Sequence, residues 1–272
     1  MISPEISTSL TLCIFILATL GGFWGILARN LSIKRLACLL AVLGFICQTA
    51  MLALGFHKAG LSVGAYMQLL AWFLVLCGIG IWYKFKQDTI LLFSAPFCLI
   101  LFAGSESLLK VFIQIPEQLN APFYTLHIGS LFLSLALLLL ASVASLLFLV
   151  LHKRLKKKHT MKGLWQDLPA LAILEKIAAI TTALAFPLYT LGIISGLLWA
   201  KPVFGTTLSG DPKEIASVVI WLLFALLFHG RFVSAWKGRK PAKLTLVILV
   251  LSLLSFLVIN TFMDTHHSFN RI

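Results

Sequence analysis

Three of the seven histidines lie at the ends of long apolar stretches, where an imidazole could do chemistry beside a membrane. His127 follows an Asn-Ala-Pro sequence that is typical of a helix start, so it lies one to two turns into its apolar stretch. His266 and His267 directly follow the last apolar stretch. Two helices that offer imidazole at similar depth on one side could hold a haem iron from both axial positions. The alternative for the pair at 266–267 is simple hydration.

The other four histidines lie in different parts of the chain, and each position suggests a different role. His229 lies inside an apolar stretch, where an ionisable group is a functional hypothesis by default. The alternative is a neutral imidazole that is hydrogen-bonded to a neighbouring helix. We interpret His152 and His159, which stand in a basic loop, as solvated surface residues, and His57 falls near the membrane face that carries His127.

The segment from Trp199 to Glu214 connects two apolar stretches. Its end predicts a helix start, with Asp211 as N-cap, proline at the first helical position and Glu214 placed as in a capping box. This structural role explains these residues without a ligand. Gly192 and Gly196 would let a helix or a flat ligand approach closely, and Trp199 is interpreted as an anchor at the membrane interface rather than a stacking surface.

Several kinds of chemistry find no support in the sequence. The five cysteines form no CxxC pair and are expected to pack as small apolar residues. No Walker, GxGxxG, HExxH or GxSxG motif occurs. The spans also lack the set of buried acids that proton and ion pumps use, which weakens the hypothesis of a small-solute transporter without excluding it.

The composition places these residues in a membrane. Of 272 residues, 60% are hydrophobic and 11% charged, and the mean hydropathy is +1.01. A soluble domain is about a quarter charged, so we exclude a soluble globule, and with it disorder, collagen and a disulfide scaffold. We predict an all-α polytopic transmembrane helical bundle of about eight spans. The predicted spans are 7–28, 36–56, 64–83, 89–108, 122–151, 177–200, 215–235 and 244–263.

The distribution of charge predicts the direction of the spans. Seventeen of the 22 Lys and Arg residues fall in the gaps after odd-numbered spans, and six of the nine acids fall on the opposite side. Because Lys and Arg favour the cytoplasmic side, both termini are predicted to lie outside. The net charge of +13 is thus an orientation signal, and we expect no nucleic-acid partner. The basic inner loop 152–176 is expected to lie along the surface of the lipid bilayer.

The organisation is predicted to be one integral membrane domain over 1–272, with four N-terminal spans in 1–115. The first span is not expected to be a cleaved signal peptide, because no basic residue precedes it and no small-residue cleavage site follows.

Several short motifs occur in a fixed order along the chain. They are Thr125-Leu126-His127, Leu168-Pro169, Leu174-Glu175, Gly196-Leu197-Leu198-Trp199-Ala200, Phe204-Gly205, Asp211-Pro212-Lys213-Glu214, Trp221, His229-Gly230-Arg231, Ala235-Trp236-Lys237-Gly238 and His267-Ser268-Phe269. This order resembles the cytochrome c assembly family, the polytopic haem-handling membrane proteins of the CcsA and HemX kind. The resemblance covers 120–270 through motifs and the first four spans through topology.

The resemblance implies that haem b sits on the outer face, with His127 and His267 as axial ligands of the iron. His229 corresponds to a membrane histidine that the larger fused members use in receiving haem. Lys201 or Lys213 could pair with the propionates.

Further cofactor-binding positions implied by the resemblance are His266, Trp199, Phe204 and Asp211. The implied partners are haem, apocytochrome c and a second cytochrome c assembly membrane subunit. The implied location is the bacterial cytoplasmic (inner) membrane.

The expected function is therefore presentation of haem at the outer face for attachment to apocytochrome c, as a possible subunit of a haem lyase rather than a stand-alone enzyme. The chain departs from the family signature at Phe204, Leu208 and Gly210, where the family has Trp. These departures motivate an alternative, a diverged HemX-like scaffold or regulator without haem chemistry.

Overall fold

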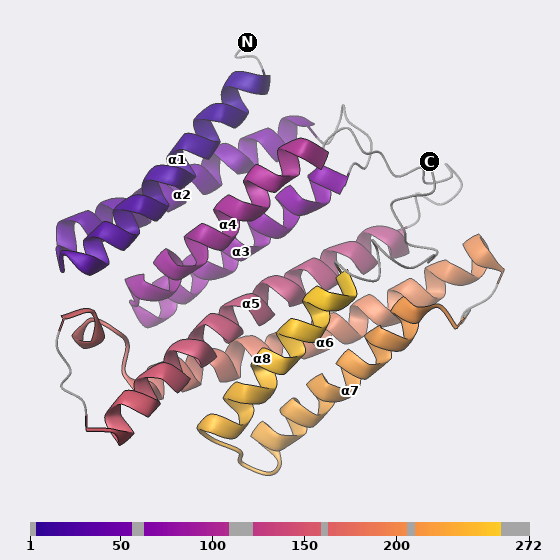
Figure 1. Ribbon diagram of the computed structural model, residues 1–272. Coiled ribbons are helices and arrows are strands. Elements are labelled where there is room, and N and C mark those ends of the chain that lie inside the picture. The colour runs from indigo at the N-terminus through magenta and orange to yellow at the C-terminus, as the bar shows by residue number, and fades with distance from the viewer. Residues whose placement is uncertain (1–3, 56–62, 109–121, 159–162, 206–209, 257–272) are drawn as a thin grey trace. The chain divides into compact units, whose positions relative to one another are not determined.

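A computed structural model describes residues 4–55, 63–108, 122–158, 163–205 and 210–256. These residues form helices joined by short turns, with no strand among them (Figure 1). The α-helices are α1 (Pro4–Leu27), α2 (Leu31–Gly55), α3 (Val63–Phe85), α4 (Asp88–Leu108), α5 (Pro122–Lys156), α6 (Leu171–Phe204), α7 (Pro212–Phe232) and α8 (Arg239–Leu254). One 3₁₀ turn, Gly163–Gln166, lies between α5 and α6.

Among the described residues, seven helices are long and apolar enough to cross a membrane, which confirms the polytopic all-α class. The spans are Ile6–Leu27, Leu31–Ala53, Gly64–Phe85, Asp88–Ser105, Phe123–Lys156, Leu171–Lys201 and Pro212–Phe232. The eighth predicted span is described only in part. Its helix α8 begins at Arg239 rather than at residue 244, and residues 257–263 lie outside the described residues.

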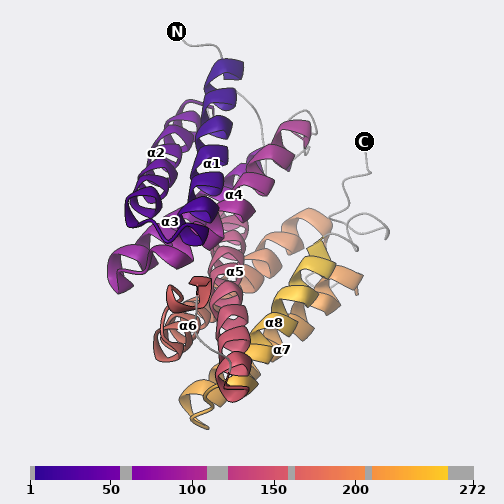
Figure 2. The same cartoon turned by 60° about the vertical axis from the view of Figure 1, so that its left-hand side comes forward.

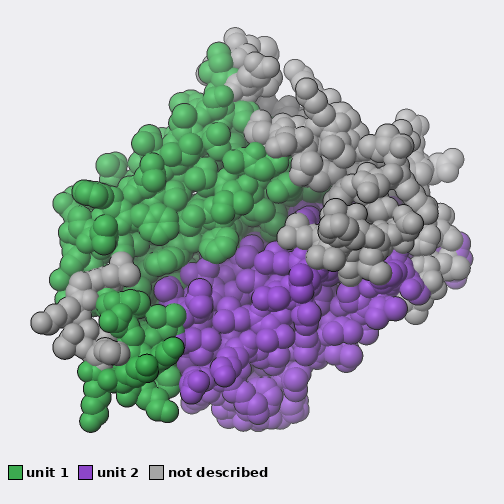
Figure 3. Space-filling view, in the orientation of Figure 1, with its two compact units in different colours: residues 1–114, 150–174 green, residues 115–149, 175–272 purple. Residues whose placement is uncertain are grey.

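The chain divides into two compact units (Figure 3). Unit 1 comprises residues 1–114 and 150–174, and unit 2 comprises residues 115–149 and 175–272. The helices α5 and α6 cross the boundary, so the end of α5 and the start of α6 belong to unit 1. The predicted single membrane domain stays a prediction.

In unit 1, small residues let the antiparallel helices α1 and α2 approach closely (Figures 1 and 2). A Cβ atom at Gly25 would lie 2.9 Å from the backbone nitrogen of Lys34, and one at Gly21 would lie 3.6 Å from the Cβ of Ala37. Small residues at such crossings are how membrane helices gain packing energy, because lipid offers no hydrophobic driving force.

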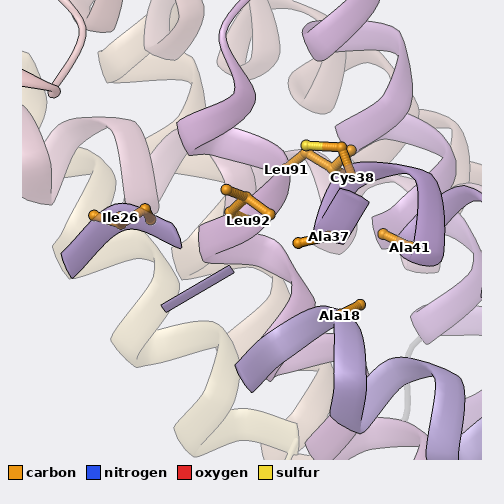
Figure 4. Close-up of a cluster of buried hydrophobic side chains, with 7 residues drawn as sticks. All are labelled: Ala18, Ile26, Ala37, Cys38, Ala41, Leu91 and Leu92. Atoms are coloured by element: carbon orange, nitrogen blue, oxygen red, sulfur yellow. The ribbon is translucent and has the colours of Figure 1, made fainter. Parts of the chain in front are cut away.

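The same contact continues into a buried cluster that joins α1, α2 and α4 (Figure 4). Its members are Ala18, Ile26, Ala37, Cys38, Ala41, Leu91 and Leu92. Cys38 is fully buried here, and all five cysteines are free thiols. Cys38 and Cys98 are buried and so pack as the sequence predicts, whereas Cys13 is exposed.

The segment after α5 is held to unit 1 by charge. Asp167 pairs with Lys34 at 3.0 Å and with Arg29 at 3.7 Å. Arg154, in the last turn of α5, lies over the ring of Trp165 at 4.0 Å from its centroid. The predicted surface loop 152–176 is therefore shorter than expected, because α5 runs on to Lys156 and α6 begins at Leu171.

In unit 2, polar side chains join the helices within the apolar surroundings. Ser134 on α5 donates to the carbonyl oxygen of Ala185 on α6 at 2.8 Å. Trp221 on α7 donates from Nε1 to Oγ1 of Thr190 on α6 at 3.0 Å. Phe186 packs against the aromatic side chains of α7. These contacts fix how α5, α6 and α7 face one another, which decides what surrounds His127.

Candidate functional site

His127 lies in the second turn of α5, as the sequence predicts, and it faces α6. Its Nδ1 atom is 2.6 Å from the carbonyl oxygen of Gly192. A carbonyl oxygen only accepts hydrogen bonds, so Nδ1 carries the proton and donates. In the neutral imidazole, Nε2 then keeps its lone pair. Histidines that ligate metals are commonly fixed in this way, with the second nitrogen donating to a backbone carbonyl.

Gly196 makes room for this imidazole. A Cβ atom at Gly196 would lie 2.6 Å from both Cε1 and Nδ1 of His127, closer than a Cβ atom can approach a non-bonded ring atom. One turn earlier, a Cβ at Gly192 would lie 2.5 Å from Cδ2 of Leu131. The predicted close approach at these two glycines is therefore confirmed, and part of what approaches is His127 itself.

Trp199 lies beside this histidine rather than in a loop. The helix α6 runs to Phe204, beyond the predicted end of its span at residue 200, so Trp199 and the backbone of Phe204 are helical. The ring of Trp199 is 5.0 Å from that of Tyr124, measured between centroids. Tyr124 is one turn before His127, so the aromatic pair and the imidazole share one end of unit 2.

The start of α7 confirms the predicted cap. Asp211 is buried, and its Oδ1 accepts from the backbone nitrogen of Lys213 at 2.8 Å. Glu214 bonds back as a capping box requires, but its Oε2 accepts from the nitrogen of Gly210 at 3.1 Å rather than from that of Asp211. The carboxylates thus have structural roles at the positive end of the helix.

Lys213 adds a cation to the same end of unit 2. It lies close enough to His127 and to Asp211 for its charge to interact with both. The structure therefore brings together His127, Trp199, Asp211 and Lys213 from three helices. An imidazole, aromatic rings and a lysine at one end of unit 2 could bind a flat, anionic ligand through a ligated metal, ring contacts and charge.

His229 belongs to another place in the same unit. It lies sixteen residues after Lys213 on α7, which is roughly 24 Å along a helix. Its side chain is exposed. The alternative that the sequence left open, a side-chain hydrogen bond to a neighbouring helix, is not found among the described residues. His57, His266 and His267 lie outside the described residues.

A second polar cluster lies at the opposite end of unit 2. Glu175, at the start of α6, accepts from the backbone nitrogen of Gly238 and lies close enough to Arg231 for their charges to interact. A Cβ atom at Gly230 would lie 2.3 Å from Cε3 of Trp236. The Trp236 ring explains the glycine at 230, and a φ of 74° explains the glycine at 238.

Two contacts near His127 were not predicted from the sequence. Tyr124 was not singled out, although its place one turn before His127 on an apolar helix could have signalled it. The acceptor for Nδ1, the Gly192 carbonyl, lies 65 residues away, and only the spacing of Gly192 and Gly196 pointed to that region.

Comparison with known proteins gives one family. A family model described as "Cytochrome C assembly protein" matches residues 4–267, which includes the four N-terminal spans. A protein of Guillardia theta named cytochrome c biogenesis protein CcsA is 28% identical over 221 residues, covering 75% of this chain and 73% of the relative.

Two further relatives carry the same name. The one from Porphyra purpurea is 26% identical over an alignment of 292 residues, which covers 91% of each chain. The one from a Synechococcus strain is 44% identical over 80 residues, covering 29% of this chain and 23% of the relative.

Proposed function

This chain belongs to the cytochrome c assembly protein family, and we propose that it binds haem and presents it at the outer face of the membrane for attachment to apocytochrome c. A role in cytochrome c biogenesis follows from the family and from the CcsA relatives. The haem, its outer position, both termini outside and a bacterial cytoplasmic membrane are parts of the proposal.

The observation that carries the proposal is the hydrogen bond of His127. Its Nδ1–H is held by the Gly192 carbonyl at 2.6 Å, which leaves Nε2 with a free lone pair. Gly196 leaves the space that the imidazole occupies, because the side chain of any larger residue would collide with the ring. The residues present therefore fit one axial ligand of a haem iron.

The surroundings of His127 fit the rest of a haem. The rings of Trp199 and Tyr124 offer an aromatic contact for the porphyrin, and Lys213 offers a cation for a propionate. Asp211 acts through the backbone, since it caps α7 and so fixes where Lys213 stands.

The second axial ligand is proposed to be His267, and the neighbouring His266 is the alternative. Phe204 is proposed to cover part of the ligand from the end of α6, and His229 to take part in receiving haem. These four assignments rest on the family motifs in the sequence.

Bound haem would supply the vinyl groups to which the cysteine thiols of an apocytochrome add. The chain's own residues hold and orient the ligand and supply no nucleophile. Apocytochrome c and a second assembly membrane subunit are the proposed partners.

The absorption spectrum of the detergent-purified protein tests this proposal. We expect a Soret band of a bis-histidine haem, and we expect a double variant, His127→Ala with His267→Ala, to lose it. If His266 is the ligand, His266→Ala should weaken the band more than His267→Ala does. An unchanged spectrum in the double variant would overturn the assignment.

A second function is favoured by one feature. Phe204, Leu208 and Gly210 stand where the family signature has Trp, and fewer indole rings would weaken the hold on a porphyrin. In this second function, the protein would act as a scaffold or regulator of cytochrome c assembly and would bind no haem. Colourless protein after expression with ample haem, together with normal cytochrome c levels in a deletion strain, would favour this function.

A further inference from the structure

Four cations lie just before α8 and in its first turns, and none of them makes an ion pair among the described residues. Lys237, Arg239, Lys240 and Lys243, which we call the basic turn, are all exposed. By contrast, Arg29 and Lys34 in unit 1 both pair with Asp167. The nearby carboxylate of Glu175 accepts from a backbone nitrogen at this turn instead.

The place of these cations makes their number unexpected. Arg239, Lys240 and Lys243 stand in the first turns of α8, where the helix dipole disfavours positive charge. The basic residues at the end of α5 stand in its last turn, where the backbone carbonyls favour them. The helix dipole therefore stabilises the positive charges at the end of α5, and it does not stabilise those of the basic turn.

Apolar surface borders the basic turn. The side chains of Phe232 and Val233 are 56% and 69% exposed at the end of α7. Nζ of Lys240 lies 3.7 Å from the ring centroid of Trp236. Exposed apolar side chains, an indole ring and ammonium groups occur together where a helix leaves the hydrocarbon for the headgroup region.

We propose that the basic turn binds the phosphate headgroup of an acidic phospholipid, whose acyl chains lie along Phe232 and Val233. A free phosphate would match the cations alone, whereas a lipid matches both the cations and the apolar residues beside them. The site needs no haem and does not depend on the proposed function.

Native mass spectrometry of the full chain in mild detergent tests this. Dioleoyl phosphatidylglycerol and dioleoyl phosphatidylcholine would be titrated separately. We expect the phosphatidylglycerol to be retained at least fivefold better than the phosphatidylcholine. One Lys or Arg at a membrane surface contributes roughly a fivefold preference for anionic lipid. Equal retention of the two lipids would overturn the proposal.

A matched pair of variants separates a site from bulk charge. One replaces the four residues of the basic turn by Gln, and the other replaces Lys153, Lys156, Lys157 and Lys158, exposed at the end of α5, by Gln. The first should lose the preference and the second should keep most of it. Equal losses would mean that only net charge matters, which contradicts a site.

Two further measurements distinguish a lipid site from misfolding of the variant and from binding of free phosphate. If the fourfold variant fails to fold or to insert, Lys240→Gln should lower the preference roughly fivefold, while Lys240→Arg should keep it. Inorganic phosphate at the lipid concentration should not displace the phosphatidylglycerol. Displacement would mean that the turn binds free phosphate rather than lipid.

Discussion

Replacing Gly196 by Ala should dislodge His127. The new Cβ would lie 2.6 Å from Cε1 and Nδ1 of the imidazole, whereas carbon atoms in contact are separated by about 3.5–4.0 Å. The ring must therefore retreat by about 1 Å. The hydrogen bond to the Gly192 carbonyl, now 2.6 Å long, would then stretch beyond the usual range of hydrogen-bond lengths.

The magnitude follows from two opposed effects. Overpacking costs about 1–3 kcal/mol and the lost hydrogen bond about 1 kcal/mol. Exchange of glycine for alanine inside a helix returns about 1 kcal/mol. We expect Gly196→Ala to destabilise unit 2 by about 1–3 kcal/mol. A ligand that needs His127 in place should bind roughly 10–100-fold more weakly.

The assay has two readouts and a matched control. Thermal unfolding in detergent reports the packing without a ligand, and titration with haem followed by absorbance reports the affinity. Gly129→Ala is the control, because Gly129 lies two residues after His127 and a Cβ there meets nothing within 4 Å. A Gly196→Ala protein that matches the control in both readouts would show that His127 does not pack against Gly196.

Three further substitutions have expected outcomes in thermal or chemical unfolding. Gly230→Ala should cost about 1–3 kcal/mol, because its Cβ would lie within 2.3 Å of the Trp236 ring, and indole fluorescence should shift as the ring moves. Ser134→Ala should cost about 0.6 kcal/mol, as is typical for one hydrogen bond between membrane helices, by removing the bond to the Ala185 carbonyl. Asp167→Asn should cost about 0.2–1 kcal/mol at low salt and less at high salt, because its ion pairs are partly exposed.

Each of these expectations has a contrary outcome. A stable Gly230→Ala protein with unshifted fluorescence would mean that the ring does not rest on the glycine. A cost above about 2 kcal/mol for the serine variant would point to a further partner for that hydroxyl. A salt-independent cost for the Asp167 variant would exclude an ion pair as its cause.

Local rules predicted the elements of this chain well. Apolar length predicted about eight spans, and seven helices of the described residues can cross a membrane; the Asp-Pro-Lys-Glu sequence predicted the N-cap Asp211. Both follow from residues close together in the sequence. Composition was a poorer guide to helix ends: the apolar run ends at residue 200, but α6 persists to Phe204 because backbone hydrogen bonds do not require apolar side chains.

The contacts of the candidate site were beyond such rules. Whether Nδ1 of His127 meets the Gly192 carbonyl depends on how α5 and α6 are rotated about their axes. Local sequence does not determine this rotation, because the two residues are 65 positions apart. The same is true of Tyr124 and Trp199. Glycine spacing predicted a close approach but not the residue that approaches.

The absorption spectrum of the purified protein, in the original sequence and with His127→Ala alone, tests the central claim most directly. We expect a bis-histidine Soret band in the original protein. In the single variant the band should be lost or changed to that of a haem with one histidine ligand, while the protein still folds. An identical spectrum in both proteins would contradict the claim that His127 holds the iron.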